Sequence, residues 1–191
     1  MSTVESRAES APTQVPGEAG VWILILLDLT VFAIFFGTAL YYRSEDPAAF
    51  AAGQGTLHVP LAVVNTVLLV TGSLVVVRAV QAARTRQIST ARRYLAAAIA
   101  SGIGFMAIKA IEYGLLLSAG HTLFSDRFFL CYFAFTGIHL VHVVIGVVVL
   151  AAIRRGLTRG LRIDLVESGA CYWHMVDLIW LVLFPLLYLL G

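Results

Sequence analysis

Residues 167–180 read Glu167-Ser-Gly-Ala-Cys-Tyr-Trp-His-Met-Val-Asp-Leu-Ile-Trp180, and they indicate the architecture of the chain. A histidine, an aspartate and three aromatic residues stand here in the first turns of an otherwise apolar final segment. Polar side chains are expensive in hydrocarbon, so each needs a partner, a water molecule or a function. The stretch is therefore typical of a motif on a membrane-spanning helix.

The composition supports a membrane protein. Hydrophobic residues make up 60% of the 191 residues and charged residues 13%, whereas a soluble domain is roughly half apolar and a quarter charged. Five apolar runs, each long enough to cross a bilayer as a helix, occupy about residues 20–42, 57–83, 91–118, 126–154 and 170–190. Because these runs are continuously apolar rather than alternating, we predict an all-α membrane protein, a five-helix transmembrane bundle.

The distribution of basic residues predicts the orientation. With five spans, the N-terminal tail and the second and fourth connections share one side, and this side carries ten arginines: Arg7, Arg78, Arg84, Arg86, Arg92, Arg93, Arg154, Arg155, Arg159 and Arg162. The other side carries Arg43 and Arg127. The positive-inside rule therefore places the N-terminus in the cytoplasm and the C-terminus outside. We expect residues 1–19 to be a flexible polar cytoplasmic tail with no cleaved signal peptide, and residues 20–191 to form one membrane domain.

Three ionisable residues stand out in the first and third spans. Lys109 and Glu112 lie three residues apart, so they share a helix face and can pair. Pairing avoids leaving one charge alone in lipid. Asp28 lies about two turns into the first span. For Glu112 and Asp28, the sequence leaves open a structural contact or a role in handling protons.

Three histidines fall within the last two spans. His139 and His142 are three residues apart near the middle of the fourth span, and His174 and Asp177 repeat that spacing in the fifth. A histidine at this depth can ligate haem or a metal, carry protons, or hydrogen-bond a neighbouring helix. The spacing alone leaves these alternatives open, and a role in handling protons is open for Asp177 as well.

Other features limit the chemistry that we expect. Arg154 and Arg155 close the fourth span, where guanidinium groups either bind lipid phosphates or simply set the topology. Small residues such as Gly102 and Gly146 predict close approaches between helices. The sequence contains no Walker or dinucleotide fingerprint and no paired-cysteine metal motif. We therefore expect no catalytic residue, no metal site and no nucleic-acid partner.

Four segments, in order along the chain, resemble subunit III of the haem–copper oxidases, the cytochrome c oxidase family. They are Val59-Pro60-Leu61…Asn65-Thr66, Phe105…Glu112-Tyr113, Thr136-Gly137-Ile138-His139-Leu140-Val141-His142 and Glu167…Tyr172-Trp173-His174-Met175-Val176-Asp177…Trp180. The chain resembles the short five-span form of the family. It carries Asp28 where the family has a glutamate, and Arg155 is the nearest counterpart of the family's lipid-binding arginine.

The resemblance implies a subunit without haem or copper of its own. It would pack against the catalytic subunit I, with subunit II in the same complex, and hold phospholipid in a cleft between two helix groups. One group would contain the first span and part of the second span, and the other group would contain the remaining helices. The complex would reduce oxygen with electrons from a donor such as cytochrome c, in a bacterial plasma membrane.

The resemblance also suggests roles for the polar residues within the spans. Asp28 and His142 would contact each other near the lipid cleft. Lys109 and Glu112 would lock the third span. Residues Glu167, Trp173, His174 and Asp177 belong to the most diagnostic motif, and its polar members would fix the fifth span against its neighbours.

Two alternative functions remain open. The segments Pro16-Gly17-Glu18…Gly20-Val21-Trp22 and 177–188 resemble the accessory subunits associated with nitric oxide reductases. A five-span haem b electron-transfer subunit, with axial ligands among His139, His142 and His174, is the other alternative. Against it, a bis-histidine haem site needs a well-spaced pair on facing helices, and two of these three histidines lie one turn apart.

Overall fold

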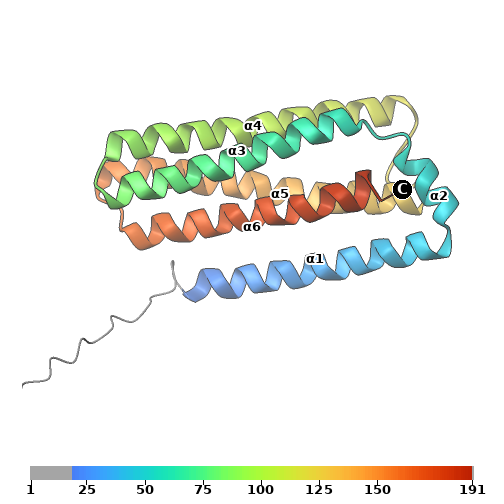
Figure 1. Cartoon of the computed structure of the whole chain (residues 1–191), viewed down its shortest axis with the longest axis horizontal. Helices are drawn as coiled ribbons and strands as arrows, with labels where there is room; N and C mark the ends of the chain where they lie inside the picture. Colours follow the sequence, from blue (N-terminus) through green and yellow to red (C-terminus); the bar gives the residue numbers. More distant parts are fainter. Residues whose placement is uncertain (1–18, 191) are drawn as a thin grey trace, which may run out of the picture.

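The structure, a computed structural model, describes residues 19–190, and this part of the chain folds into a helical bundle (Figure 1). The long helices are α1 (Ala19–Glu45), α3 (Val59–Arg84), α4 (Ile88–Ser118), α5 (Arg127–Gly156) and α6 (Ile163–Tyr188). Each of the five is long and apolar enough to cross a membrane. The prediction of a five-helix transmembrane bundle is therefore confirmed. The predicted tail lies outside the described residues, except for Ala19 at the start of α1.

α6 is the central helix of the bundle. It packs against α1, α3 and α5, and Figure 1 shows it running between α1 and α3. Within its most apolar window 61% of the residues are buried, compared with 17% in α1. α1 is thus a peripheral helix, which packs on α5 and α6 and leaves most of its surface exposed.

The expected grouping of the first span with part of the second is wrong, because α3 packs along its length on α4 and α6. The reason lies in the residue pattern. The buried positions of α3 and of α4 recur every three or four residues and include many small side chains, which let two helix backbones approach closely. These positions are Ala62, Asn65, Leu69, Gly72, Val76 and Ala79 on α3, and Ala91, Leu95, Ala98, Gly102 and Phe105 on α4.

The helices differ from the prediction most clearly in two places. α6 begins at Ile163, seven residues before the predicted 170, because Asp164 and Glu167 lower the hydropathy without interrupting the helix. The first connection contains a short helix, α2 (Pro47–Gln54), that the sequence analysis missed. Asp46 caps it by accepting a hydrogen bond from the Ala49 amide at 3.0 Å, and proline is well suited to a first helical position.

The α3–α4 turn and the α5–α6 connection lie together at one end of the bundle, and α2 lies at the other (Figure 1). The α5–α6 connection contains the 3-10 helix η1 (Leu157–Arg159). We call residues 84–88 and 157–163 the arginine-rich end. By the predicted orientation, this end faces the cytoplasm.

Candidate functional site

Trp173 fills a space that glycines on three other helices leave open. A β-carbon at Gly72 on α3 would lie 3.6 Å from the indole ring, one at Gly102 on α4 2.9 Å, and one at Gly146 on α5 3.0 Å. The Trp173 side chain is completely buried. Close helix approaches at Gly102 and Gly146 are therefore confirmed. The ring of Trp173 restricts both positions, and at Gly102 the Cγ2 atom of Val147 lies closer still, at 2.7 Å.

Two polar residues of the α6 motif attach this helix to α3. Nδ1 of His174 lies 2.6 Å from the hydroxyl of Ser73. Two turns earlier, Glu167 accepts a hydrogen bond of 2.8 Å from Nε of Arg84. The structure thus brings both predicted residues against a neighbouring helix, and it supplies partners for them that the sequence analysis did not name.

Three buried polar side chains lack such partners. Neither carboxylate oxygen of Asp177 has a partner in hydrogen-bonding geometry, although Ser73 lies near, and the same holds for both polar atoms of Asn65 and both ring nitrogens of His139. The His139 ring stacks on Trp180 instead, with 5.4 Å between centroids. An unsatisfied buried polar group costs about 1–3 kcal/mol. Stabilisation by an interhelical hydrogen bond therefore does not account for His139 in the described chain, whereas Asp177 has Ser73 of α3 as a polar neighbour.

Lys109 and Glu112 form a buried cluster that joins α4, α5 and α6. Nζ of Lys109 lies 2.8 Å from Oε2 of Glu112, and it donates to the hydroxyls of Tyr132 on α5 at 2.9 Å and Tyr188 on α6 at 3.1 Å. The Tyr188 hydroxyl donates to the other oxygen of Glu112 at 2.8 Å. Four aromatic rings lie 4.8–5.8 Å from the ammonium group, close enough for cation–π attraction.

Asp28 on α1 and His142 on α5 face each other across the gap between the two helices. Oδ1 of Asp28 lies 3.6 Å from Nε2 of His142, and both side chains are largely covered. Nδ1 of His142 lies 2.8 Å from the carbonyl of Ile138. A carbonyl only accepts, so Nδ1 carries the hydrogen, and Nε2 carries one only in the charged imidazole. A hydrogen bond within this pair therefore requires one proton that the two groups share.

A mainly apolar pocket of about 450 Å³ lies between the start of α1 and the facing parts of α5 and α6. Its lining comprises Gly20, Val21, Leu24, Val149, Ala152, Ile153, Leu161, Leu165, Ser168, Gly169 and Tyr172. Arg154 and Arg155 end α5 at the same end of the bundle but do not line the pocket. Nε of Arg154 donates to the carbonyl of Arg92 at 3.2 Å, while Arg155 is exposed. Such a pocket fits hydrocarbon rather than a polar metabolite.

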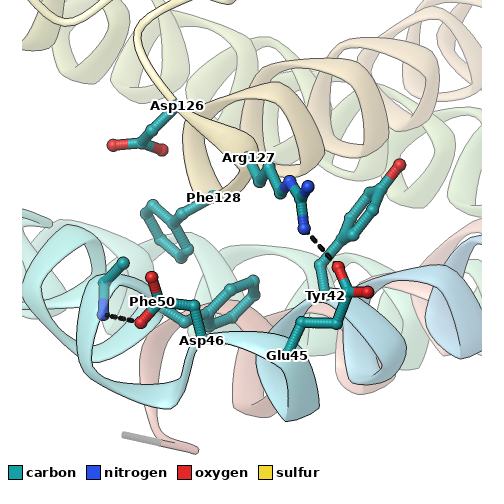
Figure 2. Close-up of a pocket in the computed structure, with 8 residues that line it drawn as sticks. Tyr42, Glu45, Asp46, Phe50, Asp126, Arg127 and Phe128 are labelled. Carbon is teal, nitrogen blue, oxygen red and sulfur yellow. Dashed lines mark hydrogen bonds and ion pairs between the residues drawn. The ribbon is translucent and has the colours of Figure 1, made fainter.

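A second pocket, of about 670 Å³, lies at the opposite end, where α1, α2 and the start of α5 meet (Figure 2). Figure 2 shows Arg127 reaching from α5 to Glu45 at the end of α1, with which it forms an ion pair. Its guanidinium also lies 5.3 Å from the ring of Tyr42. Phe50 of α2 meets Phe128 edge-on at 4.9 Å. These contacts attach the peripheral α1 to the rest of the bundle.

Sequence reasoning missed the residues that complete these contacts. Ser73 and Arg84 are the partners of the α6 motif, and Tyr132 and Tyr188 complete the Lys109 cluster. A hydroxyl within an apolar span is a weak signal, because a threonine or serine there often bonds to its own backbone. Only the packing of distant segments shows that these hydroxyls meet charged groups.

The comparisons with known proteins agree with this architecture. The sequence model of the family described as "Cytochrome c oxidase subunit III" matches residues 19–191. The chain belongs to this family. Its subunit III sequence thus covers all five membrane-spanning helices.

Individual relatives carry related names. Over its whole length the chain is 30% identical to cytochrome c oxidase subunit 3 of Synechocystis sp., covering 88% of that protein. It is 29% identical to the subunit 3 of Corynebacterium diphtheriae, with 98% of each chain covered. It is also 25% identical to a haem–copper oxidase subunit I+III of Aeropyrum pernix, where 90% of this chain matches 22% of the relative.

The family membership favours subunit III over the haem b alternative. The three histidines considered as haem ligands have separate surroundings: Trp180 for His139, Asp28 for His142 and Ser73 for His174. Among residues 19–190, no group of three or more histidine, cysteine, aspartate or glutamate side chains is placed to hold a metal ion.

Proposed function

We propose that this chain is a non-catalytic subunit III that packs against subunit I of a bacterial haem–copper oxidase and stabilises it. The observation that carries the proposal is the match to the subunit III family over all five helices. The Aeropyrum pernix relative supports subunit I as the partner, because its name joins subunits I and III in one protein. Haem and copper would reside in the partner subunits, including subunit II, and the complex would reduce oxygen in the plasma membrane.

Within this function, the apolar pocket between α1 and the α5–α6 pair would hold an acyl chain of a structural phospholipid. Its volume of about 450 Å³ and its lining of aliphatic side chains support this assignment. Arg154 and Arg155 would meet the phosphate at the same end of the bundle. The lipid would fill the space beside α1, which is the least buried of the long helices.

The polar residues would hold the helices in register rather than perform redox chemistry. Glu167 and His174 attach α6 to α3, and the Lys109–Glu112 cluster joins three helices. Asp28 with His142 connects α1 to α5. For His139, whose ring nitrogens have no hydrogen-bond partner in the described chain, and for Asp177, which has Ser73 as a polar neighbour, a role in handling protons remains our hypothesis.

The first experiment is to purify the tagged chain from its own membranes in mild detergent and to identify the proteins that accompany it by mass spectrometry. We expect a haem–copper catalytic subunit I together with a copper-binding subunit II. A nitric oxide reductase large subunit in their place would identify the chain as an accessory subunit of that reductase. Haem absorption by the chain without either partner would overturn the proposal.

The lipid assignment has its own test. Ala152→Trp fills the pocket from an exposed position on α5, whereas Ala110→Trp places the same ring on an exposed position of α4 away from the pocket. Native mass spectrometry of the complex should show fewer retained phospholipids for Ala152→Trp only. Equal lipid retention in both variants would contradict the assignment, even if subunit I still accompanied the chain.

A further inference from the structure

A third cavity, of about 810 Å³, lies at the arginine-rich end between the α3–α4 turn and the α5–α6 connection. It is lined by Ala83, Arg84, Arg86, Ile88, Leu157, Gly160, Leu161, Ile163 and Glu167. It shares only Leu161 with the acyl-chain pocket beside α1. Apart from Gly160, the uncharged residues of the lining are aliphatic. The ionisable groups in the lining are two arginines and one glutamate, so the cavity carries a net positive charge.

The pairing within this lining leaves cationic groups available. Glu167 is only 15% exposed and is held by Nε of Arg84 at 2.8 Å. This bond uses one of the guanidinium donors of Arg84, whose side chain is 57% exposed. No described carboxylate pairs with Arg86 within salt-bridge distance. The carboxylate in the cavity is therefore already neutralised, and the guanidinium of Arg86 is not.

The backbone at Arg86 also matters for the cavity. Its φ angle is +57°, and it is the one non-glycine residue with positive φ in the described chain. It ends α3 by donating its amide to the carbonyl of Ala83 at 3.0 Å, while the amide of Gln87 reaches Ala82 at 2.8 Å. Glycine is the usual residue at such a helix end, because it adopts positive φ without strain. Arg86 adopts this strained backbone conformation, and its charged side chain lies in the lining of the cavity.

Two helices also begin at the cavity. Ile88 is the first residue of α4 and Ile163 the first of α6, and neither helix has a side-chain hydrogen bond from its N-cap residue. The positive ends of both helices therefore add to the field of the two guanidinium groups.

The geometry points to a binding site for a phosphate group in this cavity, with Arg86 and the free donors of Arg84 as its ligands. Guanidinium groups match phosphate oxygens in geometry and charge. The aliphatic side chains of the lining favour a phosphate that carries hydrocarbon, so the expected source is the headgroup of an anionic phospholipid. Inorganic phosphate carries the same recognised group, and the experiment separates the two.

Arg86→Gly is the informative variant, because it removes the charge and relieves the strained backbone at once. The complex is purified through a tag on this chain and stripped of loosely bound lipid, and phosphatidylglycerol is titrated while native mass spectrometry counts the bound molecules. Loss of a charged hydrogen-bond donor should weaken binding at this site by roughly tenfold or more. Glu167→Gln should strengthen it, since Arg84 is then released.

Arg93→Gln is the matched control, an exposed arginine near the start of α4 that does not line the cavity. It should leave the affinity for phosphatidylglycerol unchanged, and Arg86→Lys should retain much of it. If inorganic phosphate binds with the same dependence on Arg86 while phosphatidylglycerol does not, the site takes a soluble phosphate. If Arg86→Gly and Arg93→Gln weaken binding equally, or neither does, the site does not exist.

Discussion

Lys109 Nζ lies 2.8 Å from Glu112 Oε2, and neither side chain is exposed at all. Two opposite charges removed from water recover their desolvation cost only if the remaining donors and acceptors are also satisfied. Here the hydroxyls of Tyr132 and Tyr188 complete the cluster. The cluster around the pair thus joins three helices. Each of the two buried charges is compensated only while the other is present.

This dependence predicts a strongly non-additive pair of substitutions. Lys109→Met leaves the Glu112 carboxylate buried without its cation and should destabilise the chain by about 3–5 kcal/mol. The double variant Lys109→Met with Glu112→Leu removes both charges and should recover most of that loss, because Tyr132 and Tyr188 lie 3.3 Å apart and can bond each other. Thermal unfolding of the purified complex measures both changes.

The exposed Arg127–Glu45 pair is the control for this experiment. Its side chains are 63% and 38% exposed, so Glu45→Gln should cost under about 1 kcal/mol. A double variant of Lys109 and Glu112 that is as unstable as Lys109→Met alone would show that the ion pair is not what the single substitution disrupts.

The indole of Trp173 predicts which glycines tolerate a methyl group. Gly146→Ala places a carbon 3.0 Å from the ring and should destabilise the chain by about 1–3 kcal/mol through overpacking. At Gly114 no atom lies within 4 Å of the new carbon, so Gly114→Ala should be neutral or slightly stabilising. Chemical unfolding in mild detergent compares the two variants. Equal effects would mean that Trp173 does not determine the need for glycine.

The bond between His174 and Ser73 should affect assembly before it affects catalysis. His174→Ala removes about 1 kcal/mol of attachment between α6 and α3, so less subunit III should co-purify with subunit I. Oxygen consumption per fully assembled complex should be unchanged. Ser73→Ala removes the same bond, and the double variant should be no worse than either single one. Activity lost at once in a fully assembled complex would refute the structural role of His174.

The gap between Asp28 and His142 predicts a stabilising substitution. At 3.6 Å the two groups are too far apart for a good hydrogen bond, and Asp28→Glu adds the methylene that would close the gap. We expect α1 to attach more firmly by about 1 kcal/mol, seen as slower hydrogen exchange of its backbone amides. Asp28→Ala, which removes the carboxylate altogether, should show no such slowing. Faster exchange in Asp28→Glu would contradict the proposed contact.

Parts of the architecture follow from residue order alone. The sequence predicts the five spans and the pairing of Lys109 with Glu112, because hydropathy and helical spacing are properties of a single segment. The start of α6 was placed too late for the same reason, since hydropathy detects the membrane and not the helix. Asp164 and Glu167 are compatible with a helix that extends beyond the hydrocarbon.

The sequence by itself thus determined a five-helix membrane protein of the subunit III family and identified the polar residues that its spans carry. Only the tertiary structure decided that α3 packs on α4 and α6, that Trp173 lies among three glycines, and that Arg86 lines a basic cavity. The physical reason is distance along the chain. Hydropathy and spacing are local properties, whereas the partner of a buried group depends on how helices far apart in sequence rotate and pack.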